Sequence, residues 1–187
     1  KKFLSSPNEY RDEFWESDDL VWIDWREFEE SIIEYFNKKL PDDDKIKFRC
    51  VEIDKERDID IILEKDGLDI VVPYADECTD RDTTIRSIQE YLYPKYQIRW
   101  YMDSLGSDTL AFCIGQTSNW KELENDFGKE FVNYYFSIIK SDSVMFNMNI
   151  DDIMNLDFSE IFDYLSLQVV KEASRLSIND FSDFISK

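Results

Sequence analysis

The hydrophobic and polar positions in the middle of the chain predict a sheet. Five runs rich in β-branched and aromatic residues lie between positions 46 and 115 and are bounded by turn residues, which is typical of strands. These runs are 46–53, 59–64, 68–72, 96–102 and 110–114. Between the second and third runs, Lys65-Asp66-Gly67 predicts a hairpin, because the glycine allows the positive φ that such a turn needs.

Apolar residues at spacings of three and four predict helices on both sides of this region and one inside it. The predicted helices cover 7–15, 24–40, 83–93, 118–138 and two further stretches after residue 150. Asp24 and Glu27 form a capping box for the second helix. The apolar face of that helix consists of Trp25, Phe28, Ile32, Tyr35, Phe36 and Leu40. Asp82 or Thr83 caps the third helix, and Gly128 is a weak point in the fourth.

These elements predict an α+β protein with a single mixed or antiparallel sheet of about five strands, in the order βββαββ, flanked by N- and C-terminal helices. No internal repeat, low-complexity segment or linker rich in proline and glycine interrupts the chain. We therefore expect one α+β domain over residues 1–187. A separate C-terminal helical lobe over residues 141–187 is the alternative.

The charge of the chain points to the class of its partner. Acidic residues number 42 and basic residues 22, so the net charge is −20, and the acids are spread along the whole sequence. Such a field repels nucleic acid and anionic membranes and attracts basic proteins. We expect a basic protein partner, no direct contact with nucleic acid or membrane, and a monomer or homodimer. A surface that only maintains solubility is the alternative explanation of the acids.

The residues that usually carry catalysis are scarce. Histidine is absent, which removes the commonest general base and the serine–histidine and cysteine–histidine nucleophiles. No glycine-rich phosphate loop or other catalytic motif occurs. We therefore expect no enzyme and no cofactor. Cys50, Cys78 and Cys113 are odd in number and far apart, which suits a reducing cytoplasm, and neither a membrane span nor a signal peptide is expected.

A pair of carboxylates offers one alternative that involves a metal. Asp58 and Asp60 lie two apart on a predicted strand, so we expect both side chains on one face. With the acidic loop 76–82 they offer oxygen ligands to a divalent cation, as in a metal-dependent hydrolase. A chain with 42 acids also contains such pairs by chance. The loop lacks the ligand spacing of an EF-hand.

Acids interleave with aromatic residues at several places. Inhibitors of basic enzymes use acids to steer the partner and aromatic side chains to anchor it. The candidate partner-binding residues chosen on this ground are Trp15, Glu16, Asp18, Asp19, Trp22, Asp76, Glu77, Asp80, Asp82 and Tyr93.

Two stretches carry a resemblance to a known class of proteins. The first runs from Phe3-Leu4-Ser5-Ser6-Pro7 through Trp22-Ile23-Asp24-Trp25-Arg26-Glu27, and the second is Asp103-Ser104-Leu105-Gly106-Ser107-Asp108-Thr109-Leu110-Ala111-Phe112, followed by Trp120, Phe127-Gly128 and Val132. In these stretches the chain resembles the small acidic immunity proteins of bacterial toxin–immunity systems.

The resemblance implies a compact cytosolic α/β or α+β protein that binds and blocks a cognate toxin. The resulting hypothesis is an inhibitor of a basic toxin such as a nuclease. The alternatives are a nucleic-acid mimic that inhibits a defence enzyme, the carboxylate-metal hydrolase, and an adaptor subunit with a non-toxic partner.

Overall fold

The computed structural model describes residues 1–148 of the chain. The contacts divide the chain into two units, Lys1–Asn147 and Met148–Lys187, and the first is described below. The helices predicted after residue 150 lie outside the described residues, and so does most of the alternative lobe 141–187. The single domain over 1–187 stays a prediction.

The first unit contains helices and strands, as the α+β class requires. Its helices are α1 (Lys2–Ser5), α2 (Pro7–Trp15), α3 (Glu29–Asn37), α4 (Arg81–Leu92), α5 (Thr117–Phe127) and α6 (Lys129–Tyr135), with 3₁₀ turns at Asp42–Asp44 and Met102–Ser104. Its strands are β1 (Val21–Asp24), β2 (Lys47–Glu52), β3 (Ile59–Lys65), β4 (Leu68–Val71), β5 (Tyr96–Tyr101), β6 (Thr109–Gln116) and β7 (Phe136–Ile138). All five predicted strands are present, as β2 to β6.

The prediction of a single sheet of about five strands is wrong, because the strands form two antiparallel sheets. Sheet A has four strands in the order β1-β6-β5-β7, and sheet B has three in the order β2-β3-β4. The outer strands of sheet A, β1 and β7, are only four and three residues long. The prediction included neither, because the capping box of Asp24 and the apolar spacing over 118–138 favoured helix at or beside these positions.

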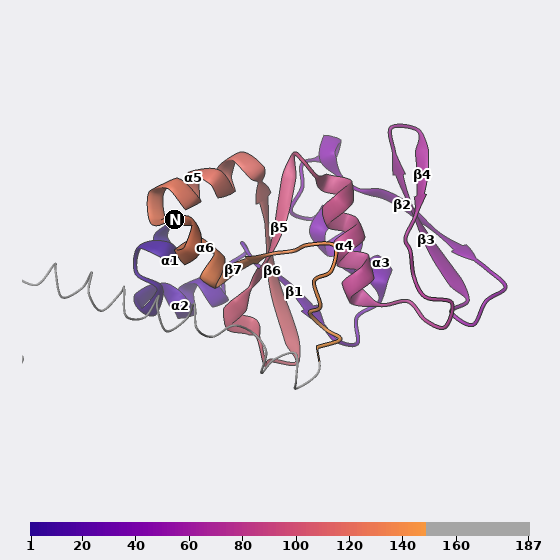
Figure 1. Ribbon diagram of the computed structural model, residues 1–187, viewed down its shortest axis with the longest axis horizontal. Coiled ribbons are helices and arrows are strands. Elements are labelled where there is room, and N and C mark those ends of the chain that lie inside the picture. The colour runs from indigo at the N-terminus through magenta and orange to yellow at the C-terminus, as the bar shows by residue number, and fades with distance from the viewer. Residues whose placement is uncertain (149–187) are drawn as a thin grey trace, which may run out of the picture. The chain divides into compact units, whose positions relative to one another are not determined.

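Helices cover both faces of sheet A (Figure 1). On one face lie α1, α2, α5 and α6, and Phe3, Trp120 and Val132 pack there against Tyr101 and Phe136 of the strands. On the other face lie α3 and α4, which bury the side chains Ile32, Ile33, Phe36, Ile85 and Ile88. Each such side chain contributes about 1.5–3 kcal/mol when it leaves water, so sheet A is the centre of the core.

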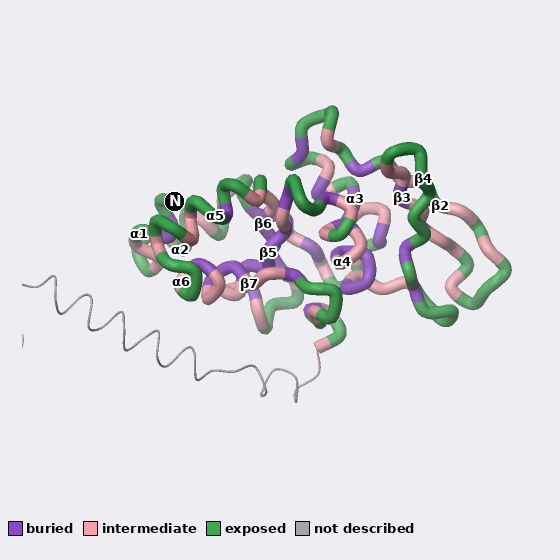
Figure 2. The backbone as a smooth tube through the Cα atoms, turned by 45° about the horizontal axis from the view of Figure 1, so that its top comes forward, coloured by how far each residue is buried: buried purple, intermediate pink, exposed green. Residues whose placement is uncertain are grey.

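Sheet B lies on the other side of α3 and α4 (Figure 1). The hairpin between β3 and β4 has φ of 53° at Asp66 and 77° at Gly67, as a type I′ turn requires. The face of β3 that carries Ile61 and Leu63 is fully buried. The opposite face is more open, and Figure 2 shows that exposed residues run along all of β4. The hydroxyl of Tyr91 in α4 donates to the carbonyl of Glu64 at 2.9 Å, which ties the helix to this sheet.

The predicted helix over 24–40 begins later than expected. Asp24 is the last residue of β1, and α3 starts only at Glu29. The Asp24 carboxylate accepts the amide of Arg26 at 2.8 Å, which holds a turn after the strand. Trp25 and Phe28, expected in the core, are therefore 53% and 68% exposed in the loop between β1 and α3.

The predicted helix over 118–138 is divided. Gly128 has a φ of 93° and separates α5 from α6, at the weak point that the sequence indicated. The last residues of this stretch, Phe136–Ile138, form β7 and pair with β5 instead of continuing the helix.

Candidate partner-binding surface

Two tryptophans meet where α2 ends and β1 begins. Trp15 is the last residue of α2 and is exposed, while Trp22 lies on β1 and is partly buried. Their ring centroids are 4.6 Å apart with an angle of 55° between the planes. The ring centroid of Tyr101, in sheet A, lies 6.2 Å from that of Trp15, so the Trp15 ring packs against the sheet. An aromatic pair is therefore held rigidly at the surface.

Three acids lie between the two tryptophans in the sequence. Glu16 follows directly on α2, Asp18 and Asp19 lie in the turn before β1, and all three are exposed. None of them forms an ion pair within residues 1–148. Lys39 donates to the backbone carbonyl of Asp18 and not to its carboxylate. We call Trp15, Glu16, Asp18, Asp19 and Trp22 the α2 patch.

The position of Glu16 at the end of α2 is unfavourable for stability. The C-terminal end of a helix carries partial negative charge, where lysine and arginine stabilise and acids destabilise. No basic residue occupies the last turn of α2. The dipole and the three carboxylates together concentrate negative potential beside the two indole rings.

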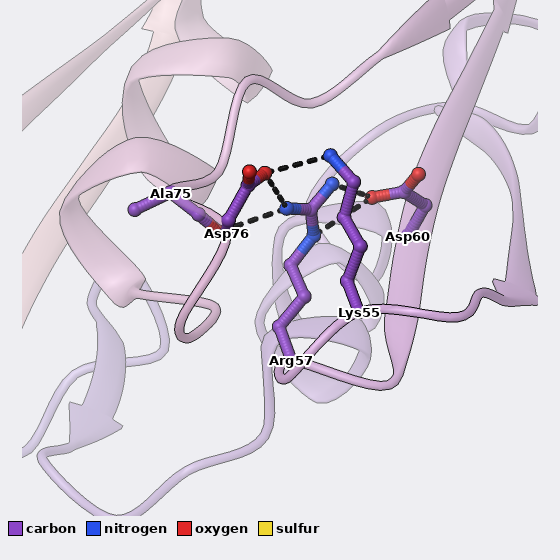
Figure 3. Close-up of polar contacts among 5 residues, drawn as sticks. All are labelled: Lys55, Arg57, Asp60, Ala75 and Asp76. Atoms are coloured by element: carbon purple, nitrogen blue, oxygen red, sulfur yellow. Dashed lines mark hydrogen bonds and ion pairs between the residues drawn. The ribbon is translucent and has the colours of Figure 1, made fainter.

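The acidic loop before α4 is more involved in structure than expected. Asp76 accepts Lys55 Nζ at 2.6 Å and Arg57 Nη1 at 3.1 Å (Figure 3). The hydrogen bond from Lys55 lowers the pKa of Asp76. Asp80 caps α4 by accepting the amide of Thr83 at 2.7 Å. Among the acids of the loop 76–82, Glu77 alone is exposed and has no such bond.

Asp82 does not belong to a surface site. It is 2% exposed, and its two oxygens accept the amides of Phe146 at 2.9 Å and of Met145 and Asn147 at 3.2 Å. The sequence suggested Asp82 as the helix cap, whereas Asp80 caps the helix and Asp82 lies in its first turn. The carboxylate therefore holds the chain near residue 146 and is closed to a partner.

Tyr93 is exposed but lies away from both acidic groups. It follows α4 at the end opposite Asp80, and twelve residues of helix separate the two by about 18 Å. Its carbonyl lies 3.5 Å from Lys65 Nζ, at the end of β3. The predicted residues thus occupy three places, and only the α2 patch brings acids and aromatic rings together.

The two carboxylates of the metal alternative do not share a face. Asp58 has a φ of 62° and lies in the turn before β3. The carboxylate of Asp60 is bound by Arg57 Nε at 3.0 Å and Nη2 at 2.6 Å (Figure 3). Within residues 1–148, no group of three or more histidine, cysteine or acidic residues is placed to hold a metal ion. The geometry of the described residues gives the metal alternative no support.

No family model matches the chain, and neither a curated protein nor a solved structure matches it. In the part of the chain that the structure describes, no helix combines the length and apolar character that crossing a membrane requires.

The structure adds two exposed aromatic residues that sequence reasoning missed. Trp25 and Phe28 lie at the far end of β1 from the α2 patch, and the guanidinium of Arg26 lies 4.9 Å above the Trp25 ring. The available signal was the β-branched and aromatic run Val21-Trp22-Ile23, which is typical of a strand. Three such residues did not outweigh the capping box of Asp24.

Proposed function

We propose that this chain is a non-catalytic binding protein that captures a basic protein through the α2 patch. The observation that carries the proposal is the group of three unpaired acids at the end of α2, beside the rigid Trp15–Trp22 pair. Glu16 opposes the dipole of its own helix, and none of the three acids forms an ion pair within residues 1–148, so interactions among the described residues do not account for them. Contact with a cationic partner would.

The partner class follows from the charge and from the resemblance to immunity proteins. A chain of net charge −20 accelerates encounter with a cationic protein. Large rigid rings at the centre of a contact then supply most of the binding energy. We infer that the partner is a basic toxin, such as a nuclease, whose phosphate-binding residues the carboxylates would cover.

The experiment starts from the tagged full chain in a nuclease-treated extract of its native host. Bound proteins are released with salt, identified by mass and expressed alone and together with the chain. We expect one basic protein, toxic alone and harmless with the chain. A non-toxic partner would overturn the toxin inference and favour an adaptor. A nucleic-acid-binding defence enzyme would favour the mimic.

Two variants of equal charge test the surface. In the first, Glu16→Gln, Asp18→Asn and Asp19→Asn neutralise the α2 patch, and we expect binding about 30-fold weaker, because exposed charges contribute about 0.7 kcal/mol each. In the control, three other exposed acids without ion pairs are neutralised: Asp54→Asn, Glu56→Gln and Asp142→Asn. Binding weakened equally by both variants would show that only net charge matters and would contradict the patch.

A further inference from the structure

The outer edge of β4 has no partner strand among the described residues. β4 is the last strand of sheet B, and all four of its residues are exposed. Three of them are large and apolar: Leu68 is 68% exposed, Ile70 43% and Val71 51%. Open strand edges of this kind favour pairing with a further strand.

The register shows which backbone groups point outward. The amide of Val72 donates to the carbonyl of Ile61 at 2.9 Å, so Val72 faces β3. Because the direction alternates along an antiparallel strand, Ile70 and Leu68 also face β3. The N–H and C=O groups of Asp69 and Val71 therefore point to the open side.

The edge of β4 has few of the features that protect against pairing. Proteins protect edges with very short strands, charges, prolines or bulges. β4 is short, with four residues, but it contains no proline, and Pro73 lies two residues beyond its end. The only charge on β4 is Asp69, and Arg49 of β2 binds its carboxylate across the sheet, with Nη1 at 3.0 Å from Oδ1. The pairing of β4 with β3 runs without a bulge from Lys65 and Leu68 to Ile62 and Val71. A regular and locally neutral edge remains.

The charge of sheet B indicates which molecule covers this edge. Its strands carry three bases and four acids, namely Lys47, Arg49, Lys65, Glu52, Asp60, Glu64 and Asp69. Their net charge is −1, and the one charge on β4, Asp69, is already bound by Arg49. A second copy therefore meets no unpaired like charge on β4, and its own β4 offers the same apolar side chains and the same open backbone groups.

We propose that β4 pairs antiparallel with β4 of a second copy, about a two-fold axis at Ile70. Asp69 of each copy then faces Val71 of the other, and the two exchange four backbone hydrogen bonds. No like charges face each other directly. The two copies of sheet B join into one sheet of six strands with an isologous interface. This pairing does not depend on the proposed function, because it leaves the α2 patch unused.

The register predicts opposite results for two substitutions of Val71. Val71→Asp places a carboxylate opposite Asp69 of the second copy, and the two-fold axis makes this repulsion occur twice. We expect the dimer dissociation constant to rise about tenfold or more. Val71→Lys places an ammonium opposite Asp69, and we expect a change of less than about threefold. Analytical ultracentrifugation of the full chain over a range of concentrations measures both.

Phe28→Asp is the matched control, because it makes the same apolar-to-acid change at an exposed residue outside sheet B; we expect no effect on dissociation. Hydrogen exchange of the unmodified chain tests the register without any variant, since the amides of Asp69 and Val71 should exchange more slowly as concentration rises. A chain that stays monomeric would overturn the proposal. Equal effects of the two Val71 variants, or dissociation by Phe28→Asp, would overturn it as well.

Discussion

The carboxylate of Asp82 joins the first turn of α4 to residues 145–147. A buried carboxylate that accepts three amides is well compensated, because hydrogen bonds to a charged acceptor are about twice as strong as neutral ones. The arrangement also closes the last described loop onto the helix that separates the two sheets. One acid therefore has a structural role where its sequence context suggested a surface role.

Removing this carboxylate should be costly. We expect Asp82→Ala to lower the free energy of unfolding by about 3 kcal/mol, because three amides, of which that of Met145 is buried, lose their acceptor at about 1 kcal/mol each. Urea denaturation measures the loss, and faster hydrogen exchange at Met145, Phe146 and Asn147 locates it. Glu77→Ala, at an exposed acid nearby, is the control and should change stability by less than about 0.5 kcal/mol. Equal losses in the two variants would contradict the role of Asp82.

Asp44 makes a second long-range connection, and this one depends on pH. Its carboxylate accepts Lys95 Nζ at 2.5 and 2.7 Å and the Tyr96 hydroxyl at 2.7 Å. The hydrogen bond from Lys95, followed by that from Tyr96, lowers the pKa of Asp44. A lowered pKa in the folded state means that the ionised group stabilises the fold above the ordinary pKa of about 3.9, and that this contribution is lost as pH falls further.

We therefore expect Asp44→Asn to be less stable than the unmodified chain near neutral pH. The difference should shrink as pH falls below about 4, because the carboxylate of the unmodified chain is then protonated. Thermal unfolding at several pH values measures the difference. Asp43→Asn is the control, since Asp43 is exposed and forms no ion pair within residues 1–148. A difference for Asp44→Asn that does not vary with pH would refute the ionic contribution.

At the scale of elements, α5 is fastened to sheet A by a buried ion pair. Arg99 of β5 is 2% exposed, its Nη2 lies 2.6 Å from Glu124 Oε1, and its guanidinium lies 4.5 Å from the Trp120 ring. Gln97 and Asn133 accept its remaining donors at 2.8 to 3.0 Å. Burial lowers the pKa of Arg99, and Glu124 opposes that shift. The pair fixes the position of α5 on the sheet.

Removing one partner of this ion pair should lower the free energy of unfolding more than replacing both partners with apolar residues. We expect Glu124→Ala to lower the free energy of unfolding by about 3 kcal/mol, because it leaves a buried cation without its counter-charge. The double variant Arg99→Met, Glu124→Leu should recover most of this loss. Glu122→Ala in the same helix removes only an exposed partner of Lys1 and should cost much less. A double variant as unstable as the single one would contradict this account.

The sequence predicts most of the helices and strands, but it does not show which strands pair with one another. Strands β2 to β6 follow from their apolar runs, and the β3–β4 hairpin follows from Asp66-Gly67. The pairing of β1 with β6 and of β7 with β5 depends on contacts between distant segments, which periodicity does not encode. Trp25 and Phe28 were misplaced for the same reason, since strand pairing overrode the local helix signal of Asp24 and Glu27.

The candidate site shows the same division between local and distant information. The α2 patch could be proposed from the sequence because its five residues lie within eight positions of one another. Asp82 was misassigned because its partners lie more than sixty residues away. The free edge of β4 was not foreseen, because the sequence does not show which strands end a sheet.

At the scale of the molecule, charge separates the two proposed interactions. The one charge on β4 is paired with Arg49, whereas the chain as a whole is strongly acidic. Salt screens the repulsion between two acidic copies, and it also screens the attraction between an acidic and a basic protein. The two interactions should therefore respond to salt in opposite directions.

We expect self-association to strengthen and binding of the basic partner to weaken when salt rises from about 0.05 M to about 0.5 M, where the Debye length falls several-fold. Sedimentation at the two concentrations measures the first effect. Retention of the partner by the tagged chain measures the second. If salt weakens self-association, the dimer uses charged surfaces and not the neutral edge of β4.

The two edges of sheet B also decide whether assembly stops. In polymer chemistry, a unit with two reactive ends grows without limit, and a unit with one reactive end stops at a pair. β4 is the reactive end of sheet B, whereas β2, at the other edge, carries the charged side chains Lys47, Arg49 and Glu52, which discourage further pairing. Replacing Lys47 and Glu52 with valine would remove the charges that protect β2 from pairing. The dimer would then become the repeating unit of a fibre.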